Sequence, residues 1–108
     1  RLIGSFQAVK HMCAEMADEL EPCYSLVWHA AYCFDNSPDE ARLMACHAKS
    51  HVSEISKMIA KKATEVHGGM GFTDLMGLHY WFKRIGVNRH ILGAPELVRE
   101  EAANIQNF

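Results

Sequence analysis

Glycine is the residue type that stands out where chemistry is concerned, and it is concentrated between residues 65 and 73. That segment reads Glu-Val-His-Gly-Gly-Met-Gly-Phe-Thr. One glycine after a helix supplies the left-handed conformation that a helix end favours. Three glycines followed by an aromatic residue exceed that need, and extra glycines let another backbone or a ligand approach closely. The segment therefore points to a phosphate or nucleotide neighbour, although the pattern alone is not specific.

Histidines offer a second kind of site, since the chain contains 7 of them. His47 and His51 lie one helical turn apart, a spacing at which two imidazoles can share a metal. No third ligand is evident, because Cys46 projects about 100° away around the helix. We therefore interpret the pair as solvated or packed, and we predict no metal site.

The 4 cysteines are the remaining candidates for nucleophilic or redox chemistry: Cys13, Cys23, Cys33 and Cys46. No local base or orienting acid marks any of them as an activated nucleophile. Those that share a helix are about 15 Å apart, which is too far for a disulfide. We expect reduced cysteines in the helical core of an intracellular protein.

Composition excludes several functional classes. Lys and Arg total 11 against 13 Asp and Glu, for a formal net charge of -2, and clustered basic residues are scarce. A nucleic-acid surface is therefore not expected. No apolar run approaches the roughly 20 residues that span a bilayer, and the start lacks the layout of a signal peptide. Because the chain begins at Arg1 without Met, we expect residues 1–108 to be a fragment comprising one domain.

The first expected element is a long helix over residues 5–34. Its apolar residues recur at spacings of three and four: Phe6, Val9, Cys13, Met16, Leu20, Cys23, Val27, Ala31 and Phe34. Pro22 falls inside this helix and removes a backbone hydrogen bond. We predict a kink near Glu21 or a break into two helices, and we favour the kink because the stripe stays in phase.

A turn at residues 35–37 precedes the second helix, which is expected to run to residue 66 or 67. Ser37 as N-cap, Pro38 in the first turn and Glu40 completing a capping box mark its start. A third helix is expected over residues 75–85, and a last one from residue 94 to about residue 105. The stretch between Gly86 and Gly93 is not assigned. Together these elements predict an all-α, up-down bundle of about four helices.

Three separated motifs resemble the C-terminal domain of the acyl-CoA dehydrogenases. The first is Ile-Gly-Ser-Phe-Gln-Ala-Val-Lys-His at residues 3–11, followed by Ala-Glu-Met at 14–16. The second is Ala48-Lys49 with Ser53-Glu54. The third is Val-His-Gly-Gly-Met-Gly-Phe-Thr at residues 66–73, which resembles the family's Gly-Gly-x-Gly-Tyr/Phe signature. Their order and spacing also match, so the resemblance covers essentially the whole chain.

The resemblance implies a three-domain flavoprotein that carries FAD and oxidises acyl-CoA to enoyl-CoA. In that family a glutamate removes the α-proton, hydride passes to the flavin, and electrons go on to an electron-transferring flavoprotein. The C-terminal domain builds the core of a dimer or tetramer, and it touches FAD across the subunit boundary. A homo- or hetero-oligomer is therefore implied, located in the cytoplasm of a bacterium or, as the alternative, in the mitochondrial matrix.

The resemblance also assigns cofactor contacts. Phe6 and Gln7 match a position near the FAD pyrophosphate and ribityl region. Glu65, Val66, His67, Gly68 and Gly69 match a segment of the neighbouring subunit that lies on the adenosine half. The family often has Gln at the position of Glu65, and a carboxylate beside a diphosphate is unfavourable unless it points away or binds a ribose hydroxyl. The family's FAD-binding arginine would lie before Arg1.

The catalytic position departs from the family. Residues 91–97 read Ile-Leu-Gly-Ala-Pro-Glu-Leu where the family often reads Tyr-Glu-Gly-Thr-x-Glu/Gln-Ile. Leu92 thus replaces the catalytic glutamate and cannot act as a base. Ala94 replaces a threonine that contacts the flavin, whereas Gly93, on the substrate side, and Glu96, on the cofactor side, keep their places. Residues 79–84 also differ, and resemble divergent subunits of heteromeric bacterial acyl-CoA dehydrogenases.

Several outcomes stay open from the sequence. The parent protein can carry its base on an upstream helix, serve as the non-catalytic partner of a heteromer, or perform a different reaction on a CoA thioester. The fragment itself is expected to be inactive and to self-associate through its apolar stripes. The rival function class is a non-catalytic helical interaction or oligomerisation module, and the presence of flavin discriminates between the two classes.

Overall fold

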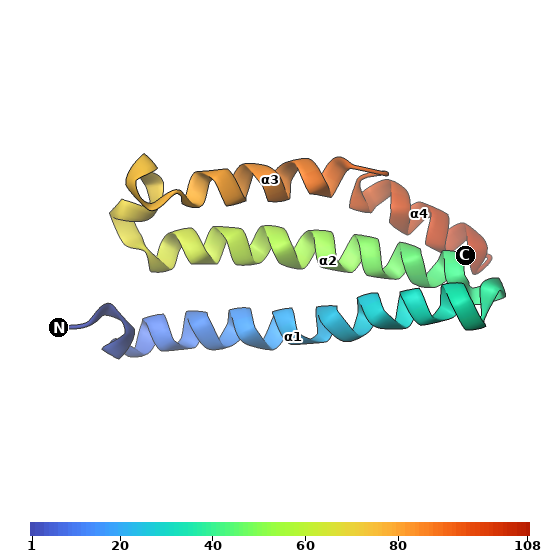
Figure 1. Cartoon of the computed structure of the whole chain (residues 1–108), viewed down its shortest axis with the longest axis horizontal. Coiled ribbons are helices and arrows are strands. Elements are labelled where there is room, and N and C mark those ends of the chain that lie inside the picture. The colour runs from blue at the N-terminus through green and yellow to red at the C-terminus, as the bar shows by residue number, and fades with distance from the viewer.

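The computed structural model describes residues 1–108 and contains helices but no strand, which confirms the all-α prediction. The four α-helices are α1 (Gln7–Asn36), α2 (Pro38–Val66), α3 (Leu78–His90) and α4 (Pro95–Ile105). A short 3-10 helix precedes α1 at Ile3–Ser5. Two more connect α2 to α3, at Gly68–Phe72 and Asp74–Met76. The molecule is a rod with extents of 54 × 25 × 24 Å (Figure 1).

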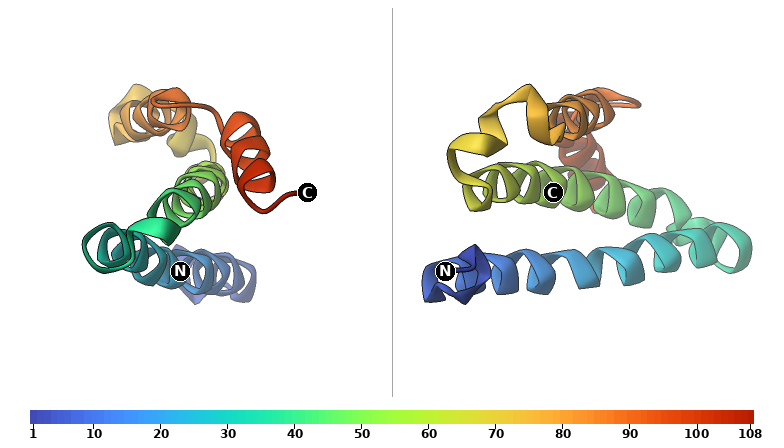
Figure 2. Two further views of the ribbon diagram at one scale, coloured as in Figure 1. Left: turned by 90° about the vertical axis from the view of Figure 1, so that its right-hand side faces the viewer. Right: turned by 60° about the vertical axis from the view of Figure 1, so that its left-hand side comes forward.

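The helices form three rows, so the predicted four-helix bundle is wrong in its arrangement. α1 and α2 run antiparallel, and α2 lies at the centre, where it packs against α1, α3 and α4 (Figures 1 and 2). α3 covers the C-terminal half of α2 and α4 covers the N-terminal half. With 13 and 11 residues against 29 in α2, the last two helices are too short to run the length of the rod, and together they make one row.

α1 is a single helix of 30 residues with Pro22 inside it, so the alternative of two separate helices is wrong. Pro22 is exposed, and the carbonyl group that its ring leaves without a partner can bond to water.

The predicted apolar stripe of α1 is only half right. Its buried residues are Cys23 and Cys33, and partly buried neighbours lie at residues 9, 12, 16, 26 and 30. Leu20, Val27 and Phe34 were expected in the stripe but are 40%, 47% and 76% exposed. The helix therefore has two adjacent apolar faces, and α2 covers one of them.

The four cysteines are also divided between buried and exposed positions. Cys23, Cys33 and Cys46 are buried free thiols, as expected, whereas Cys13 is exposed and does not belong to the core. Burial raises the pKa of the Cys23 and Cys46 thiols, which keeps them protonated near neutral pH.

Both ends of α2 were predicted, with one difference in chemistry. Ser37 stands at the N-cap, but its side chain makes no capping hydrogen bond; its carbonyl oxygen accepts the Glu40 N–H at 3.0 Å. At the other end, Gly68 adopts φ +63°, the left-handed conformation expected after the helix. The buried core joins α2 to α4 through Cys46, Val98 and Ala102.

The third helix was predicted too early and too short. Residues 74–76 form a 3-10 helix, and α3 runs from Leu78 through Gly86 to His90. α4 begins at Pro95 and reaches Ile105, as the sequence indicated. None of these helices is both long and apolar enough to cross a membrane.

Candidate functional site

The residues assigned to a cofactor site fall into two groups at different places along the rod. Because α1 and α2 are antiparallel, Phe6 and Gln7 lie at the same end as residues 65–69 (Figure 1). Residues 92–96 lie at the turn between α3 and α4. The 13 residues of α3 separate the two groups by about 20 Å, at 1.5 Å per residue.

The three glycines of the first group differ in what the chain itself requires of them. Gly68 needs its left-handed φ. Gly71 is buried, and a Cβ atom there would lie 2.6 Å from the Thr64 carbonyl oxygen and 3.0 Å from the His67 Cβ atom. Gly69 has no such φ, and a Cβ atom there would meet nothing within 4 Å. Helix ending and packing therefore account for two glycines and leave Gly69 without a role inside the chain.

Among the other residues of this end, Val66 is half-buried, whereas the rest are exposed: Phe6, Gln7, Glu65 and His67. The His67 Nδ1–H donates to the Ala63 carbonyl oxygen at 2.7 Å, which fixes the ring and leaves Nε2 free. Phe6 is half-exposed beneath the Arg1 guanidinium group, whose carbon lies 4.3 Å from the ring centroid. The Gln7 amide lies 3.3 Å from His11 Nε2. Phe6, Gln7 and His67 are therefore all accessible at this end of the rod.

A hollow of about 450 Å³ lies beside the glycine-rich segment, between α2, the Gly68–Phe72 helix and α3. Its lining residues are Lys61, Thr64, Glu65, Gly71, Phe72, His79, Phe82 and Lys83. The exposed Glu65 carboxyl group thus shares this hollow with two lysines. The His79 Nδ1 atom is buried without a hydrogen-bond partner. The sequence did not predict this hollow, because Lys61 comes from α2 whereas His79 and Lys83 come from α3, and only tertiary packing brings the two helices together.

The second group occupies a turn with unusual backbone. Leu92 has φ +63° and is 95% exposed, and Gly93 has φ +109°. A Cβ atom at Gly93 would lie 3.2 Å from Val98 Cγ2, so conformation and space both require glycine there. Left-handed backbone is uncommon for leucine and is found where the surroundings impose it. The turn presents a Leu92 side chain with no ionisable group.

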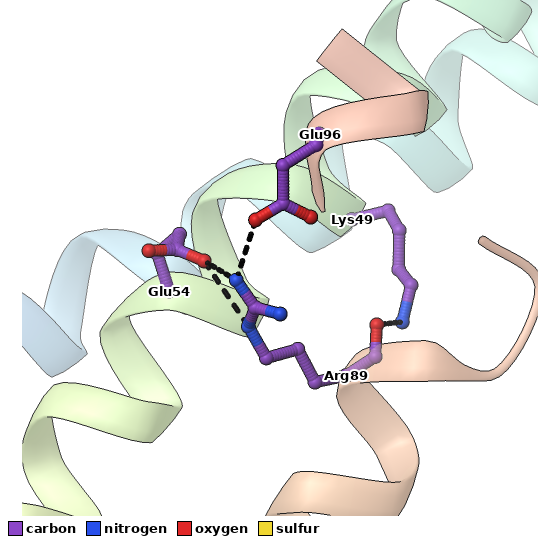
Figure 3. A network of polar contacts seen from close by, with 4 residues as sticks. All are labelled: Lys49, Glu54, Arg89 and Glu96. Carbon is purple, nitrogen blue, oxygen red and sulfur yellow. Dashed lines mark hydrogen bonds and ion pairs between the residues drawn. The ribbon is translucent and has the colours of Figure 1, made fainter. Parts of the chain in front are cut away.

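Charged residues surround the start and end of this turn (Figure 3). The Arg89 Nη2 group donates to Glu54 Oε1 at 2.7 Å and to Glu96 Oε1 at 2.8 Å, and Arg89 Nε donates to Glu54 at 3.2 Å. The bonds to Glu54 and then Glu96 raise the pKa of the Arg89 guanidinium group. The backbone N–H of Glu96 itself, followed by Arg89, lowers the pKa of the Glu96 carboxyl group. The turn is thus bracketed by permanently charged groups at neutral pH.

The sequence did not predict this ion-pair network. Glu54 and Arg89 are 35 residues apart, and no helical spacing links them. His47 and His51 gather no third ligand, since no group of three or more His, Cys, Asp or Glu side chains is placed to hold a metal ion. The His47 ring instead lies 3.2 Å from the Gln106 amide.

Comparison with known proteins gives one family over nearly the whole chain. Residues 1–105 match the family described as acyl-CoA dehydrogenase, C-terminal domain. No solved structure gives a significant match.

Three relatives illustrate the range of similarity. The caffeyl-CoA reductase-Etf complex subunit CarC of Acetobacterium woodii is 41% identical over 70 residues, covering 65% of this chain and 18% of the relative. (R)-benzylsuccinyl-CoA dehydrogenase of Thauera aromatica is 29% identical over 97 residues, covering 90% of this chain and 24% of the relative. Acyl-CoA dehydrogenase IpdE2 of Mycolicibacterium smegmatis is 30% identical over 104 residues, covering 94% of this chain and 32% of the relative. The chain thus spans less than a third of the length of each of these three relatives.

Proposed function

The chain belongs to the acyl-CoA dehydrogenase family, and on that basis we propose that it supplies FAD contacts and a subunit interface to an oxidoreductase that converts acyl-CoA to enoyl-CoA. In such a protein the bound flavin accepts the hydride. The residues of this chain bind and orient the cofactor. We assign Phe6 and Gln7 to the pyrophosphate and ribityl region, and residues 65–69 to the adenosine half bound by the neighbouring subunit.

The observation that carries this proposal is the open space at Gly69. A methyl group there would touch nothing in the chain, and the backbone does not need the left-handed conformation. Glycine costs conformational entropy relative to alanine, so its presence favours close approach of something outside the chain. A cofactor lying against the backbone of residues 68 and 69 meets this condition.

We propose that the catalytic base lies in another part of the parent protein, because Leu92 stands at the usual position of the glutamate. Its side chain is almost fully exposed and has no proton to exchange. An upstream helix-borne base comes first among the alternatives, followed by a non-catalytic role within a heteromer, and then by a different reaction on a CoA thioester. The Ala94 methyl group replaces a hydroxyl group at the proposed flavin contact, so it can offer packing but no hydrogen bond.

The subunit interface is proposed to include the uncovered apolar face of α1. Leu20, Tyr24, Val27 and Trp28 are exposed and recur at helical spacing on one side of α1. An apolar face of this kind marks a surface for association. A homo- or hetero-oligomer is expected, and the name of the CarC relative, from an Etf complex, favours an electron-transferring flavoprotein as a further partner.

The compartment is proposed to be the bacterial cytoplasm. The three relatives compared above come from bacteria, whereas one matching short/branched chain specific acyl-CoA dehydrogenase from Bos taurus is mitochondrial by name. The mitochondrial matrix is therefore the alternative.

A second candidate function is a helical oligomerisation module without cofactor, and the α1 face supports it equally well. The two candidate functions differ in whether the full-length protein binds flavin. The test uses the full-length protein that contains this chain, in three forms: unmodified, Gly69→Ala, and Gly86→Ala as a matched control. Gly86 is also free of neighbours within 4 Å, but it lies within α3, away from the proposed cofactor surface.

We expect the unmodified protein to purify with a flavin absorbance spectrum, and Gly69→Ala to bind FAD roughly tenfold more weakly, since inserting a methyl group into a close contact costs about 1–3 kcal/mol. Gly86→Ala should bind FAD normally and be slightly more stable, because alanine favours a helix. A full-length protein that purifies colourless and binds no added FAD would reject the enzyme proposal.

A further inference from the structure

We infer that Arg89, Glu54 and Glu96 form a positioning network that fixes the α3–α4 turn, residues 91–94, on α2. The network consists of these three side chains, and Lys49 supports it. The link from the turn to a cofactor rests on the proposed function, but the positioning of the turn does not. Within this network Glu96 acts through Arg89 on the shape of the turn, and the cofactor contact expected of its carboxylate stays a separate prediction.

The geometry places one member of the network on each of the three elements that meet at the turn. Glu54 comes from α2, Arg89 from the last turn of α3, and Glu96 from the first turn of α4 (Figure 3). The Arg89–Glu96 bond at 2.8 Å closes the chain across the turn. The Arg89–Glu54 bond at 2.7 Å holds that closed turn against α2.

Lys49 fixes the backbone that leads into the turn. Its Nζ group donates to the carbonyl oxygen of Asn88 at 2.5 Å and to that of Arg89 at 3.4 Å. These carbonyl groups belong to the last turn of α3, where helix carbonyls lack partners within the helix and a cation is favourable. The backbone and the side chain of Arg89 are therefore both held by α2.

Two features separate this network from an ordinary surface ion pair. The Arg89 side chain is 14% exposed, whereas that of Arg42, which joins α2 to α4 through Glu101, is 77% exposed. The difference lies in the arginines, since the carboxylate partners Glu54 and Glu96 are 37% and 64% exposed. Water screens an exposed pair and leaves it with little effect, but it screens Arg89 less. The turn also holds a leucine in left-handed backbone, a conformation that persists when its surroundings over-determine it.

The two carboxylates have separate tasks. Glu54 connects the turn to α2, and its loss would free the closed turn as a unit. Glu96 connects the two sides of the turn, and its loss would let residues 91–94 change shape. The Glu96 carboxylate bonds to Arg89 through Oε1, and its second oxygen lies on a side chain that is 64% exposed.

The first experiment measures amide hydrogen exchange at residues 91–94 in the full-length protein. Arg89→Met removes the charge but keeps the length of the side chain, and Arg42→Met is the matched control on another pair between α2 and the last helices. We expect exchange to become several-fold faster in Arg89→Met and to stay unchanged in Arg42→Met. Equal exchange in both variants would overturn the inference.

Milder variants keep the inference testable if Arg89→Met does not fold. Arg89→Lys keeps the charge without the planar fork, so its exchange rate should lie between those of the unmodified protein and Arg89→Met. Glu96→Gln should accelerate exchange within the turn, and Glu54→Gln should do so at residues 89–94 together. Unchanged exchange in all three folded variants would also overturn the inference.

A second measurement separates this inference from the proposed function. If the unmodified protein binds FAD, Arg89→Met should shift the flavin absorbance maximum or weaken FAD binding several-fold relative to Arg42→Met. An unchanged flavin spectrum and affinity, despite faster exchange, would overturn the link between the turn and the cofactor. If no form of the protein binds FAD, the proposed function fails, and the exchange rates still decide whether the network positions the turn.

Discussion

The two halves of the rod differ in how much they bury. In the half that contains α4, Cys33, Cys46, Val98 and Ala102 are buried and join the three rows of helices. The glycine-rich half contains the start of α1, the end of α2, the connection after α2 and most of α3. Beyond Ser53, near the middle of α2, Gly71 is its one buried residue. It exposes large apolar side chains such as Leu75 and Trp81, but the other half also exposes Phe34 and Phe108.

This contrast separates what the chain stabilises by itself from what other groups must cover. The α4 half has a small core of the kind that holds a domain together. Both halves expose aromatic surface of the kind that binds a ligand, another domain or another subunit, and the glycine-rich half adds open backbone at Gly69. The α3–α4 turn lies at the border, where the Arg89 network takes the place of apolar burial.

The largest expected effect concerns the buried glycine of the glycine-rich half. Gly71→Ala would place a Cβ atom 2.6 Å from the Thr64 carbonyl oxygen, so the backbone would have to move. We expect a loss of up to about 3 kcal/mol in the free energy of unfolding, measured by chemical denaturation. Gly69→Ala, two residues away and unhindered, should change that free energy little. Equal losses in the two variants would contradict the separate roles of these glycines.

A pair of matched substitutions tests the contrast between the halves directly. Val98→Ala removes buried methyl groups from the core, whereas Val87→Ala makes the same change on α3 at a residue 57% exposed. We expect Val98→Ala to lower the free energy of unfolding by about 2 kcal/mol and Val87→Ala by less than about 0.5 kcal/mol. A larger loss for Val87→Ala in the full-length protein would show that another domain or subunit covers α3.

A smaller effect is expected from acid titration at the border. The lowered pKa of Glu96 means that its contribution to stability is complete above its ordinary value of 4.5 and is lost as pH falls through the lowered value. Glu96→Gln should therefore flatten the decline of the melting temperature below about pH 4.5. Glu100→Gln, an exposed carboxylate on the same helix, is the control. A decline that remains equally steep in both variants would count against Glu96, with its backbone N–H and its Arg89 bond, as the source.

The smallest effect is expected at Leu92. Its side chain is exposed and shares no contact with the core, so Leu92→Glu should leave stability and turnover of the parent protein nearly unchanged if the base lies upstream. Turnover of an acyl-CoA substrate by the full-length protein is the measurement. A large gain in turnover would mean that no other residue of the parent protein supplies the base.

Helix existence and helix ends were predictable where local chemistry decides them. Pro38 and Gly68 mark the two ends of α2, and Pro95 marks the start of α4, because each residue restricts or permits backbone angles by itself. The family could also be identified, since its three motifs are contiguous in sequence. The boundary of α3 was misplaced because Gly86 reads as a helix breaker, although it lies within the helix.

Arrangement and side-chain networks could not be predicted in the same way. Phe34 and Leu26 are both apolar and both lie on α1, and the choice of which face meets α2 depends on the partner helix. The three-row arrangement follows because α3 and α4 are both too short to run the length of α2 and lie end to end. Arg89 and Glu54 meet through tertiary packing, which leaves no periodic signal in the sequence.

Amide hydrogen exchange with and without FAD shows whether the glycine-rich end faces the cofactor. In the full-length protein, FAD should slow exchange at residues 65–69 and at Gln7, while residues 100–105 of α4 should exchange at the same rate in both conditions. Slower exchange confined to segments outside the glycine-rich end would contradict the account.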